Sequence, residues 1–507
     1  MTSDYLELSR RENQARGLGR YAVDFLAGKL GRPSATVLAK VEQFHLDTVA
    51  CAVAALATGT TAPRVLRAEA LEYPASSGAT CFGSELPVAP EKAVLANCSA
   101  VRELDANGTN FGYNPRTGYS RGEFGHPDFF PVAVAAAQLV GCDGNRLLLA
   151  MLCIEEIRCR LGEVFALKDH KLDHVLHGAI ASAAVYGALL GATAEQIESA
   201  MGLVVSHYVP FRAIRHGEQL SDSKGASAAL SAEVAILSMR RAMRGFVGPA
   251  DIFRNPQALF SLFEPSGDKE CSPFDLALTV GGEDFAVMGE HFKLGLYEHQ
   301  SASAIAGLID LLTAHPQLLS SAAAIRGVRI TIYEPAFSII GDPHKRNPQT
   351  RQSADHSMVY IIATLLRKAL ETQTAGWREL MLVPDDYDAA ALAHPLTRDL
   401  MGRIDFRHGG ADYDAKYPDG IPTSIEIEHA ALGVLGSGLV MYPEGHARNT
   451  SGNLAALLRH KFERLAGLGV SDTAALYQRM SNLSARSAAE VRALYSFPIA
   501  GVSAGSS

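Results

Sequence analysis

Residues 172–191 read LDHVLHGAIASAAVYGALLG and carry the clearest fold signal in the chain. Two polar residues, Asp173 and His174, precede a run of small and apolar side chains that is longer than a typical strand. The apolar run is shorter than the roughly 20 residues that span a bilayer, so it predicts a buried helix. Its alanines and glycines would let neighbouring helices approach closely. We therefore expect a helical protein built around this segment.

The sequence on both sides continues this helical pattern. From about residue 19 to 265, apolar residues recur at three- and four-residue spacings. Gly191 can end the helix of 173–191, and Thr193 with Gln196 forms a capping box that starts the next one. The helices expected in this part are 35–57, 91–104, 129–140, 145–164, 173–191, 195–206 and 225–244.

The pattern changes after about residue 285, where strand-like alternation appears. Val328, Ile330 and Ile332 alternate within 325–333, and shorter strands are expected at 423–428 and 439–442. Helices are expected between them at 300–313, 354–371 and 389–402, followed by a helical stretch over 451–500 with a capping box at Ser487 and Glu490. The fold class predicted is mainly α, a large all-helical domain with a smaller α+β domain.

Composition excludes several classes of protein. A chain of 507 residues with 48% hydrophobic and 20% charged side chains is typical of folded globular proteins. A net charge of −8 lacks the basic excess that binds phosphate backbones, so no nucleic-acid partner is expected. The short apolar runs disfavour a membrane partner. The polar N-terminus has no apolar signal core, which favours a cytoplasmic protein.

The sequence also gives no positive sign of a cofactor or metal. Its seven cysteines are scattered without a CxxC pair, which predicts buried hydrophobic side chains in place of disulfides or a zinc site. It holds no Walker loop and no GxGxxG in a strand-to-helix context. His170, His174 and His177 could share a helical face and hold a metal, but the spacing alone is weak and we expect none.

Four polar clusters interrupt the apolar helical sequence. Cations and imidazoles placed in loops before helices describe an anion pocket with acid and base groups, because helix N-termini add positive potential. Any one of these residues has a structural explanation, such as a helix cap, but four clusters together favour a site. The clusters are 102–109 with 125–128, 172–175, 212–225 and 292–300.

Several of these motifs resemble the MmgE/PrpD family, whose enzymes act on small polycarboxylates. The resemblance rests on motifs that occur in the same order from about residue 20 to 495. The motifs are Leu172-Asp-His-Val-Leu, Arg212-x-x-Arg-His with Ser223-Lys-Gly, Gly245-Phe-Val-Gly-Pro, Asn347-Pro-x-x-Arg with Ala354-Asp-His-Ser, and Tyr442-Pro-x-Gly-His-Ala-Arg.

The resemblance implies a fold, a partner and a set of site residues. It implies a helical domain formed by residues 1–285 and by C-terminal helices within 446–507, an α+β lid domain over 286–445, and a homodimer that works without metal or cofactor. The cleft residues carried over from the family are Asp105, Thr109, His126, His174, Lys224 and Lys293, with His299 in the adjoining lid-side motif.

The reaction implied is loss of water from a hydroxy-polycarboxylate such as 2-methylcitrate. We expect Arg212, Arg215 and Lys293 to hold substrate carboxylates, with Thr109 and His299 as further contacts. His174 or Lys224 is the candidate base, and His126, oriented by Asp105, is the candidate acid for the departing hydroxyl.

Three alternatives stay open at this level. A decarboxylase of the cis-aconitate type or an epimerase would use the same proton chemistry, and a non-catalytic binding or assembly protein would keep the scaffold alone. Two departures from the dehydratase pattern bear on the choice. Gly108 stands where that pattern has a second acid, and the stretch 111–124 is longer and richer in tyrosine and arginine.

Overall fold

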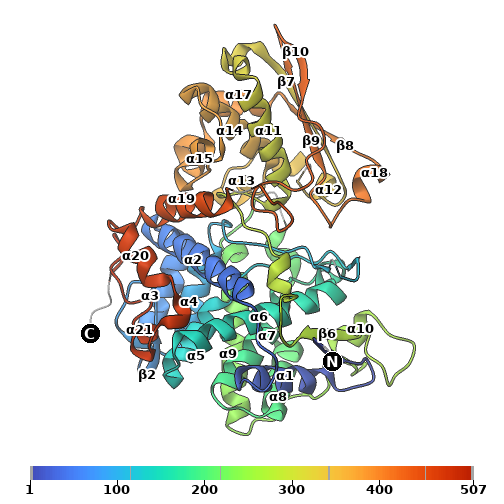
Figure 1. The fold of residues 1–507 in the computed structure, drawn as a ribbon, viewed down its shortest axis with the longest axis vertical. Coiled ribbons are helices and arrows are strands. Elements are labelled where there is room, and N and C mark those ends of the chain that lie inside the picture. The colour runs from blue at the N-terminus through green and yellow to red at the C-terminus, as the bar shows by residue number, and fades with distance from the viewer. Residues whose placement is uncertain (1–3, 115, 217–218, 341–342, 452, 504–507) are drawn as a thin grey trace.

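The computed structural model describes residues 4–114, 116–216, 219–340, 343–451 and 453–503. The described chain is mainly helical with short strands, which confirms the predicted fold class. Figure 1 shows a large helical part below and a smaller part above that combines helices with a sheet. Helix α19 (Leu454–Ala466) lies where the two parts meet (Figure 1).

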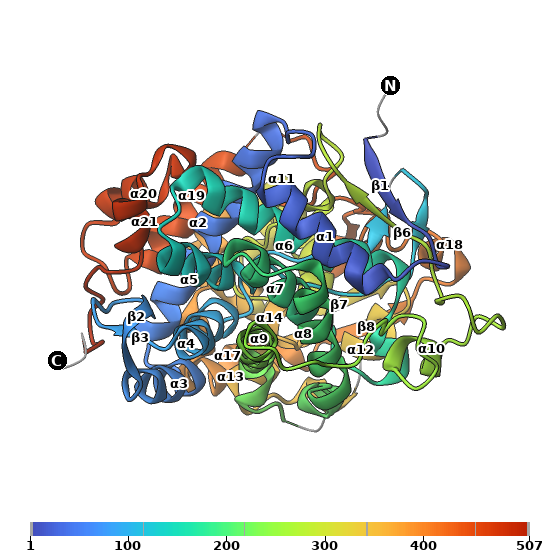
Figure 2. The ribbon, with the colours of Figure 1, turned by 90° about the horizontal axis from the view of Figure 1, so that it is seen from below.

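The larger part is a bundle in which α7 (Val175–Leu189) is central. Every residue of α7 is buried, and the helix packs against α6, α8 and α9. Figure 2 shows these helices together near the middle of the bundle. The remaining helices surround them. The helices of this part are α1 (Gln14–Leu26), α2 (Ala35–Ala57), α3 (Thr61–Leu71), α4 (Pro90–Arg102), α5 (Phe130–Val140), α6 (Gly144–Val164), α8 (Ala194–His207), α9 (Ser223–Met243) and α10 (Leu259–Phe263).

Close packing around α7 depends on its glycines, as the sequence predicted. A Cβ atom at Gly178 would lie 2.0 Å from a ring carbon of Phe129, and one at Gly187 would lie 2.5 Å from the sulfur of Met239. Neither contact is possible for a larger residue without movement of the neighbour. Thr193 and Gln196 form the predicted capping box that starts α8. This packing fixes the N-terminal end of α7, where His174 lies.

Short two-stranded pairs lie in the larger part, and one of them joins segments that are far apart in the chain. Each pair is antiparallel and short, so the pairs tie loops together and do not form a layer of the fold. The pairs are β1 (Tyr5–Leu8) with β6 (Leu276–Thr279), β2 (Pro74–Thr80) with β3 (Pro87–Val88), and β4 (Tyr113–Asn114) with β5 (Tyr119–Ser120).

The smaller part is built on a four-stranded sheet in the order β10-β9-β7-β8. β7 pairs with β8 in parallel and with β9 in antiparallel, and β10 adds to β9. The strands are β7 (Ile325–Ile332), β8 (Ile404–His408), β9 (Thr423–His429) and β10 (Gly433–Gly436). The helices are α11 (Ala302–Ala314), α12 (Ala336–Ile340), α13 (Arg351–Ala354), α14 (Met358–Thr372), α15 (Trp377–Leu380), α16 (Ala389–Leu392), α17 (Pro395–Met401) and α18 (Ala411–Asp414).

The predictions for this part were less accurate. The strand expected at 439–442 is wrong, because Gly438 turns the chain at φ +71° and only Val440 pairs, with Thr423. The strand lies earlier, in β10, where Val434 is exposed and gives no alternating burial signal. β8 was not predicted. The helix expected over 389–402 is two helices separated by Ala393 and His394, and Pro395 starts the second of them.

The C-terminal helices pack against the larger part. They are α19, α20 (Thr473–Met480) and α21 (Ala488–Arg492), and they contact α2 and α5. Ser487 and Glu490 form the predicted capping box of α21. The domain boundaries at 285 and 445 stay a prediction. All seven cysteines are buried and free, as the sequence indicated.

We searched the described residues for a helix that could cross a bilayer. No single helix is both long and apolar enough. The α2 and α3 helices together reach the length and composition, but they are bent by 90° at their junction.

Candidate active site

A cavity opens between the two parts of the molecule. The larger part contributes loops that precede its helices, and the smaller part contributes Ile339, Lys345 and His356. Its lining includes every residue singled out from the sequence as catalytic or substrate-binding: Asp105, Thr109, His126, His174, Arg212, Arg215, Lys224, Lys293 and His299. The structure therefore brings these distant segments together, while their individual roles stay predictions.

Asp105 is an ionised carboxylate held by three cations. It follows α4 with φ +51°, in the left-handed region that aspartate tolerates better than most residues. Its carboxylate pairs with Arg102 and Lys293, and its Oδ2 lies 3.2 Å from the Nζ of Lys224. Burial alone would raise the pKa of Asp105, but these cations hold it well below its usual value. The Asp105 carboxylate is thus suited to holding these three cations in fixed positions in the cavity.

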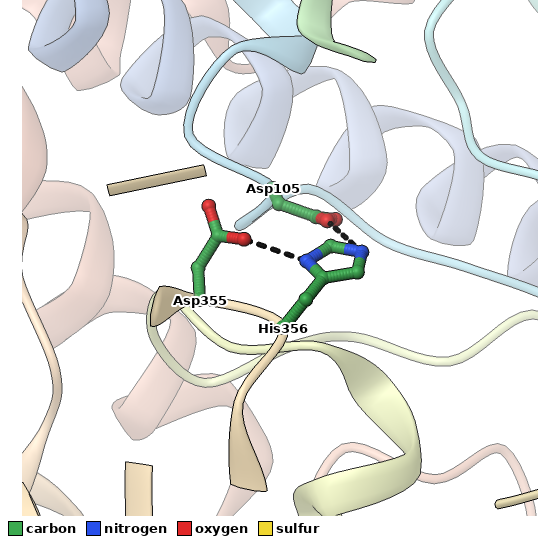
Figure 3. A group of neighbouring side chains, drawn as sticks. All are labelled: Asp105, Asp355 and His356. Carbon is green, nitrogen blue, oxygen red and sulfur yellow. Dashed lines mark hydrogen bonds and ion pairs between the residues drawn. The ribbon is translucent and has the colours of Figure 1, made fainter. Parts of the chain in front are cut away.

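Asp355 and His356 complete this charged cluster, and sequence reasoning gave neither of them a role (Figure 3). The Nζ of Lys224 lies 2.6 Å from Asp355 Oδ1 and 2.9 Å from His356 Nδ1. His356 Nε2 lies 3.2 Å from Asp105 Oδ2. Burial and the neighbouring Lys224 lower the pKa of His356 to about 4, so its ring is neutral near pH 7. Their adjacent Asp-His pair in the 354–357 motif was the available signal.

The same cluster has the geometry of a small cation site. Ligand atoms of Asp105, Asp355 and His356 lie within 4.8 Å of one another. The ammonium of Lys224, however, lies within 3.2 Å of all three side chains, so it supplies the positive charge there. A second group, Glu155 with Cys159 and Glu290, likewise has a protein cation, since Arg158 pairs with both glutamates. These contacts disfavour a metal at either group.

The histidine spacing that could have held a metal is not on one helix. His170 ends a short 3-10 turn (Leu167–His170), and Lys171 reverses the backbone at φ +61° before α7 begins at Val175. His170 Nε2 instead lies 3.0 Å from Glu264 Oε1. The helical face inferred for His170, His174 and His177 is therefore wrong, because the chain turns between the first and second histidine.

His174 has the arrangement of an oriented base. Its Nδ1 lies 3.2 Å from Asp173 Oδ1, and Asp173 is held in turn by the guanidinium of Arg215. Despite burial, Arg215 and His174 keep the pKa of Asp173 well below its usual value, so Asp173 is ionised. Its carboxylate accepts a hydrogen bond from the Nδ1–H of His174. This leaves Nε2 bare, buried and without a hydrogen-bond partner among the described residues. Burial lowers the pKa of His174, against the opposing effect of Asp173.

His126 is held differently from the prediction. Its Nδ1 lies 2.9 Å from the Gly108 carbonyl, and its Nε2 lies 3.2 Å from Arg102 Nη2. Because a guanidinium only donates, Nε2 must accept and Nδ1 must carry the proton. Burial, reinforced by Arg102 and Lys293, lowers the pKa of His126 well below its usual value. The orienting partner is thus Gly108 and not Asp105, which is reached only through Arg102, and His126 has no proton ready for an outgoing group.

The predicted substrate-binding residues differ in how free they are. Arg215 is committed to Asp173, and Lys293 to Asp105. Arg212, in a 3-10 turn (Arg212–Arg215), has no ion pair or side-chain hydrogen bond to any described residue. The Thr109 hydroxyl donates to the Gly125 carbonyl at 3.0 Å. Arg212 is therefore the cavity cation most available to a ligand carboxylate.

His299 and Gln300 also present unused polar atoms to the cavity. Both side chains line it, both are buried, and neither nitrogen of His299 nor either amide atom of Gln300 has a partner among the described residues. Unpaired buried polar atoms cost about 1–3 kcal/mol each, which favours a ligand with several hydrogen-bonding oxygens. The sequence singled out the cluster but not Gln300.

Glu298 is a cavity residue that lies in the 292–300 cluster, and sequence reasoning assigned it no role of its own. Its Oε2 accepts the Gln300 backbone N–H at 2.8 Å, which fixes the side chain at the start of a 3-10 turn (His299–Ser301). Burial raises the pKa of Glu298 to about 7, although Lys293 opposes the shift. A carboxyl group that is half protonated near neutral pH can act as a general acid.

Comparison with known proteins places the chain that forms this cavity in a family. The MmgE/PrpD N-terminal domain matches residues 20–272, and the MmgE/PrpD C-terminal domain matches residues 297–483. The chain belongs to the MmgE/PrpD family. Its relatives include 2-methylcitrate dehydratases of Salmonella typhi, 24% identical over 433 residues, and of Escherichia coli K12, 23% identical over 417 residues. Each match covers 77% of this chain and 81% of the relative.

The glycine at position 108 has a steric cause in this chain. A Cβ atom at Gly108 would lie 2.4 Å from a ring carbon of Phe44 and 3.0 Å from the His291 carbonyl oxygen. Phe44 stacks on Phe292 with ring centroids 4.0 Å apart, so it cannot give way easily. Aromatic packing therefore leaves no room for a larger side chain at position 108.

The stretch 111–124 contributes to one wall of the cavity. Phe111 and Phe124, from the two ends of the stretch 111–124, both line it, and their rings meet edge to face at 5.7 Å. β4 and β5 pair between them. The two ends of this stretch thus contribute aromatic surface to the cavity, in keeping with a ligand that has an apolar portion beside its charged groups.

Proposed function

We propose that the protein is a hydro-lyase that removes water from a small hydroxy-polycarboxylate, with 2-methylcitrate as the best-supported substrate. The observation that carries this proposal is the oriented His174, whose bare Nε2 shares one cavity with the guanidinium of Arg212, which pairs with no described residue. A base beside a carboxylate-binding cation is what removal of a proton α to a carboxylate requires. The dehydratase relatives support the same reaction class.

Of the two candidate bases, the geometry favours His174 over Lys224. Lys224 already contacts Asp105, Asp355 and His356, so its nitrogen is committed to the charged cluster. His174 Nε2 takes the proton, and the electron pair of the broken C–H bond forms the carbon–carbon double bond as the C–O bond breaks. Arg212 stabilises the carboxylate that carries the developing charge.

The departing hydroxyl needs a proton to leave as water. Glu298 supplies it in our proposal, in place of His126, because His126 uses both ring nitrogens within the protein. The carboxyl proton of Glu298 moves to the hydroxyl oxygen and leaves a carboxylate beside Lys293. His174 then releases its proton to solvent and Glu298 takes up a proton from solvent, which restores both groups.

The reaction is tested with the purified protein and three acids. Incubation with 2-methylcitrate should produce the ultraviolet absorbance of a conjugated unsaturated acid without release of carbon dioxide. Carbon dioxide release from cis-aconitate would instead show a decarboxylase, and exchange of an α proton without net dehydration would show an epimerase. No turnover and no change in thermal stability with 2-methylcitrate, citrate or cis-aconitate would rule out the proposal and favour a binding or assembly protein.

The pKa of Glu298 predicts a pH dependence. A general acid acts only while protonated, so kcat/KM should fall as pH rises through about 7, the raised pKa of Glu298. Glu298→Gln cannot donate this proton; we expect a loss of about 10²-fold or more and a profile that no longer falls near pH 7. Rates measured from pH 5 to 9 check both.

Glu123 provides a matched control for this experiment. Burial also raises its pKa to about 7, but it lies outside the cavity lining. Glu123→Gln should therefore keep the alkaline fall in rate. A wild-type alkaline limb that persists in Glu298→Gln, or one that disappears in Glu123→Gln, would remove Glu298 from the acid role.

The oligomer implied by the family resemblance remains a proposal as well. We expect a homodimer, with each chain holding its own cavity. Light scattering coupled to gel filtration measures the mass directly, and a mass near the 54.0 kDa of one chain would contradict this expectation.

A further inference from the structure

A fully buried lysine from the C-terminal helices contacts two backbone segments that carry residues of the candidate site. Lys461, on α19, is 0% exposed although most lysines lie at the surface. Its Nζ contacts Asp47 Oδ1 on α2 at 2.5 Å, which forms a buried ion pair. Its other two contacts are backbone carbonyls, those of Ala106 at 2.5 Å and Lys293 at 2.8 Å.

These two carbonyls belong to the segments that carry Asp105 and Lys293. The segments are already joined by a two-way bridge, in which Thr109 N–H donates to the His291 carbonyl at 2.9 Å and His291 N–H donates to Thr109 at 2.8 Å. The Lys293 side chain also donates to the backbone carbonyl of Asp105 at 3.0 Å. Lys461 adds a third connection, because its Nζ donates to one carbonyl of each segment.

We propose that Lys461 is a positioning residue that fixes the spacing of the Asp105 and Lys293 segments. This spacing holds the Asp105 cluster, the charged group of Asp105, Lys224, Asp355 and His356, in its reactive geometry. An ammonium has three hydrogens, and Lys461 directs them to one carboxylate and two carbonyls that would otherwise be buried without a partner. The C-terminal helices are thereby part of the active-site support. This inference rests on the proposed function only for the choice of assay substrate.

Two variants separate positioning from stability. Lys461→Met removes the ion pair and both carbonyl contacts, whereas Asp47→Asn removes the ion pair but leaves Lys461 its two carbonyls and an oxygen acceptor. Both should lower the melting temperature. Only Lys461→Met should lower kcat, by about 10²-fold with little change in KM, because small misplacements of catalytic groups are costly. Should Lys461→Met fail to fold, Asp47→Asn/Lys461→Met avoids an unpaired buried charge and carries the same expectation.

Hydrogen exchange gives a readout that does not need the substrate. In Lys461→Met, amides of 105–109 and 291–294 should exchange faster, while those of α7 should not. Lys368→Met is the matched control, since Lys368 also contacts a carboxylate, Asp386 at 2.7 Å, and a carbonyl, Met381 at 2.9 Å, away from the cavity.

Each outcome decides the question. Parallel losses of kcat in Lys461→Met and Asp47→Asn, scaling with melting temperature, would overturn the proposal, as would unchanged exchange in both segments. A wild-type protein inactive on all three acids would refute the proposed function, while faster exchange confined to 105–109 and 291–294 would still support the positioning role.

Discussion

Replacing His174 by glutamine is expected to lower kcat by about 10³-fold, the usual contribution of a general base. The His174 Nε2 is the bare, buried nitrogen that shares the cavity with Arg212, and glutamine offers no comparable proton acceptor. Because burial lowers the pKa of His174, the neutral base should persist below pH 6.5, and the acid limb of the wild-type rate should lie below that value. Steady-state rates and far-ultraviolet circular dichroism check activity and fold together.

His177 is the control for this substitution. It lies on the next turn of α7, it is equally buried, and its Nε2 also has no partner among the described residues. It lies outside the cavity lining, however. His177→Gln should therefore retain activity. Near-normal turnover by a folded His174→Gln protein would eliminate His174 as the base.

Replacing Lys224 by methionine is expected to lower the free energy of unfolding by about 3–5 kcal/mol, because two buried carboxylates lose a cation that they share. Lys224 is 2% exposed and lies between the carboxylates of Asp105 and Asp355. Activity should be lost as well, since both carboxylates and His356 would move apart. Denaturant unfolding measures the first effect, and the dehydration assay the second.

Lys92 is a matched control near the surface. It also pairs with two carboxylates, Glu69 at 2.5 Å and Glu233 at 2.7 Å, but the side chain of Glu69 is 39% exposed. Exposed pairs contribute about 0–1 kcal/mol, so Lys92→Met should cost much less and leave activity unchanged. Equal losses in the two variants would show that the Asp105 cluster has no special role in stability.

The helices of the larger part were predictable because their signal is local. The segments expected at 35–57 and 145–164 correspond to α2 (Ala35–Ala57) and α6 (Gly144–Val164). Apolar periodicity and capping residues are properties of neighbouring residues in the sequence. These two helices bury the apolar residues that the periodicity marks. β8 and β10 depend on which strand lies beside them, so exposed residues such as Val434 gave no reliable local signal.

The sequence by itself determined the helical body, the buried free cysteines and the identity of nine residues that line one cavity. The helical body and the cysteines follow from residue type and order. The nine residues were identified from the polar clusters together with the family resemblance, since charged groups in otherwise apolar segments need either partners or a function. The partnerships were decided only by the tertiary structure. In it, His126 forms hydrogen bonds with Gly108 and Arg102, Arg215 pairs with Asp173, and Lys461 donates to two active-site carbonyls. Which cation stays free for a ligand depends on distances between segments far apart in the chain, and no local pattern encodes them.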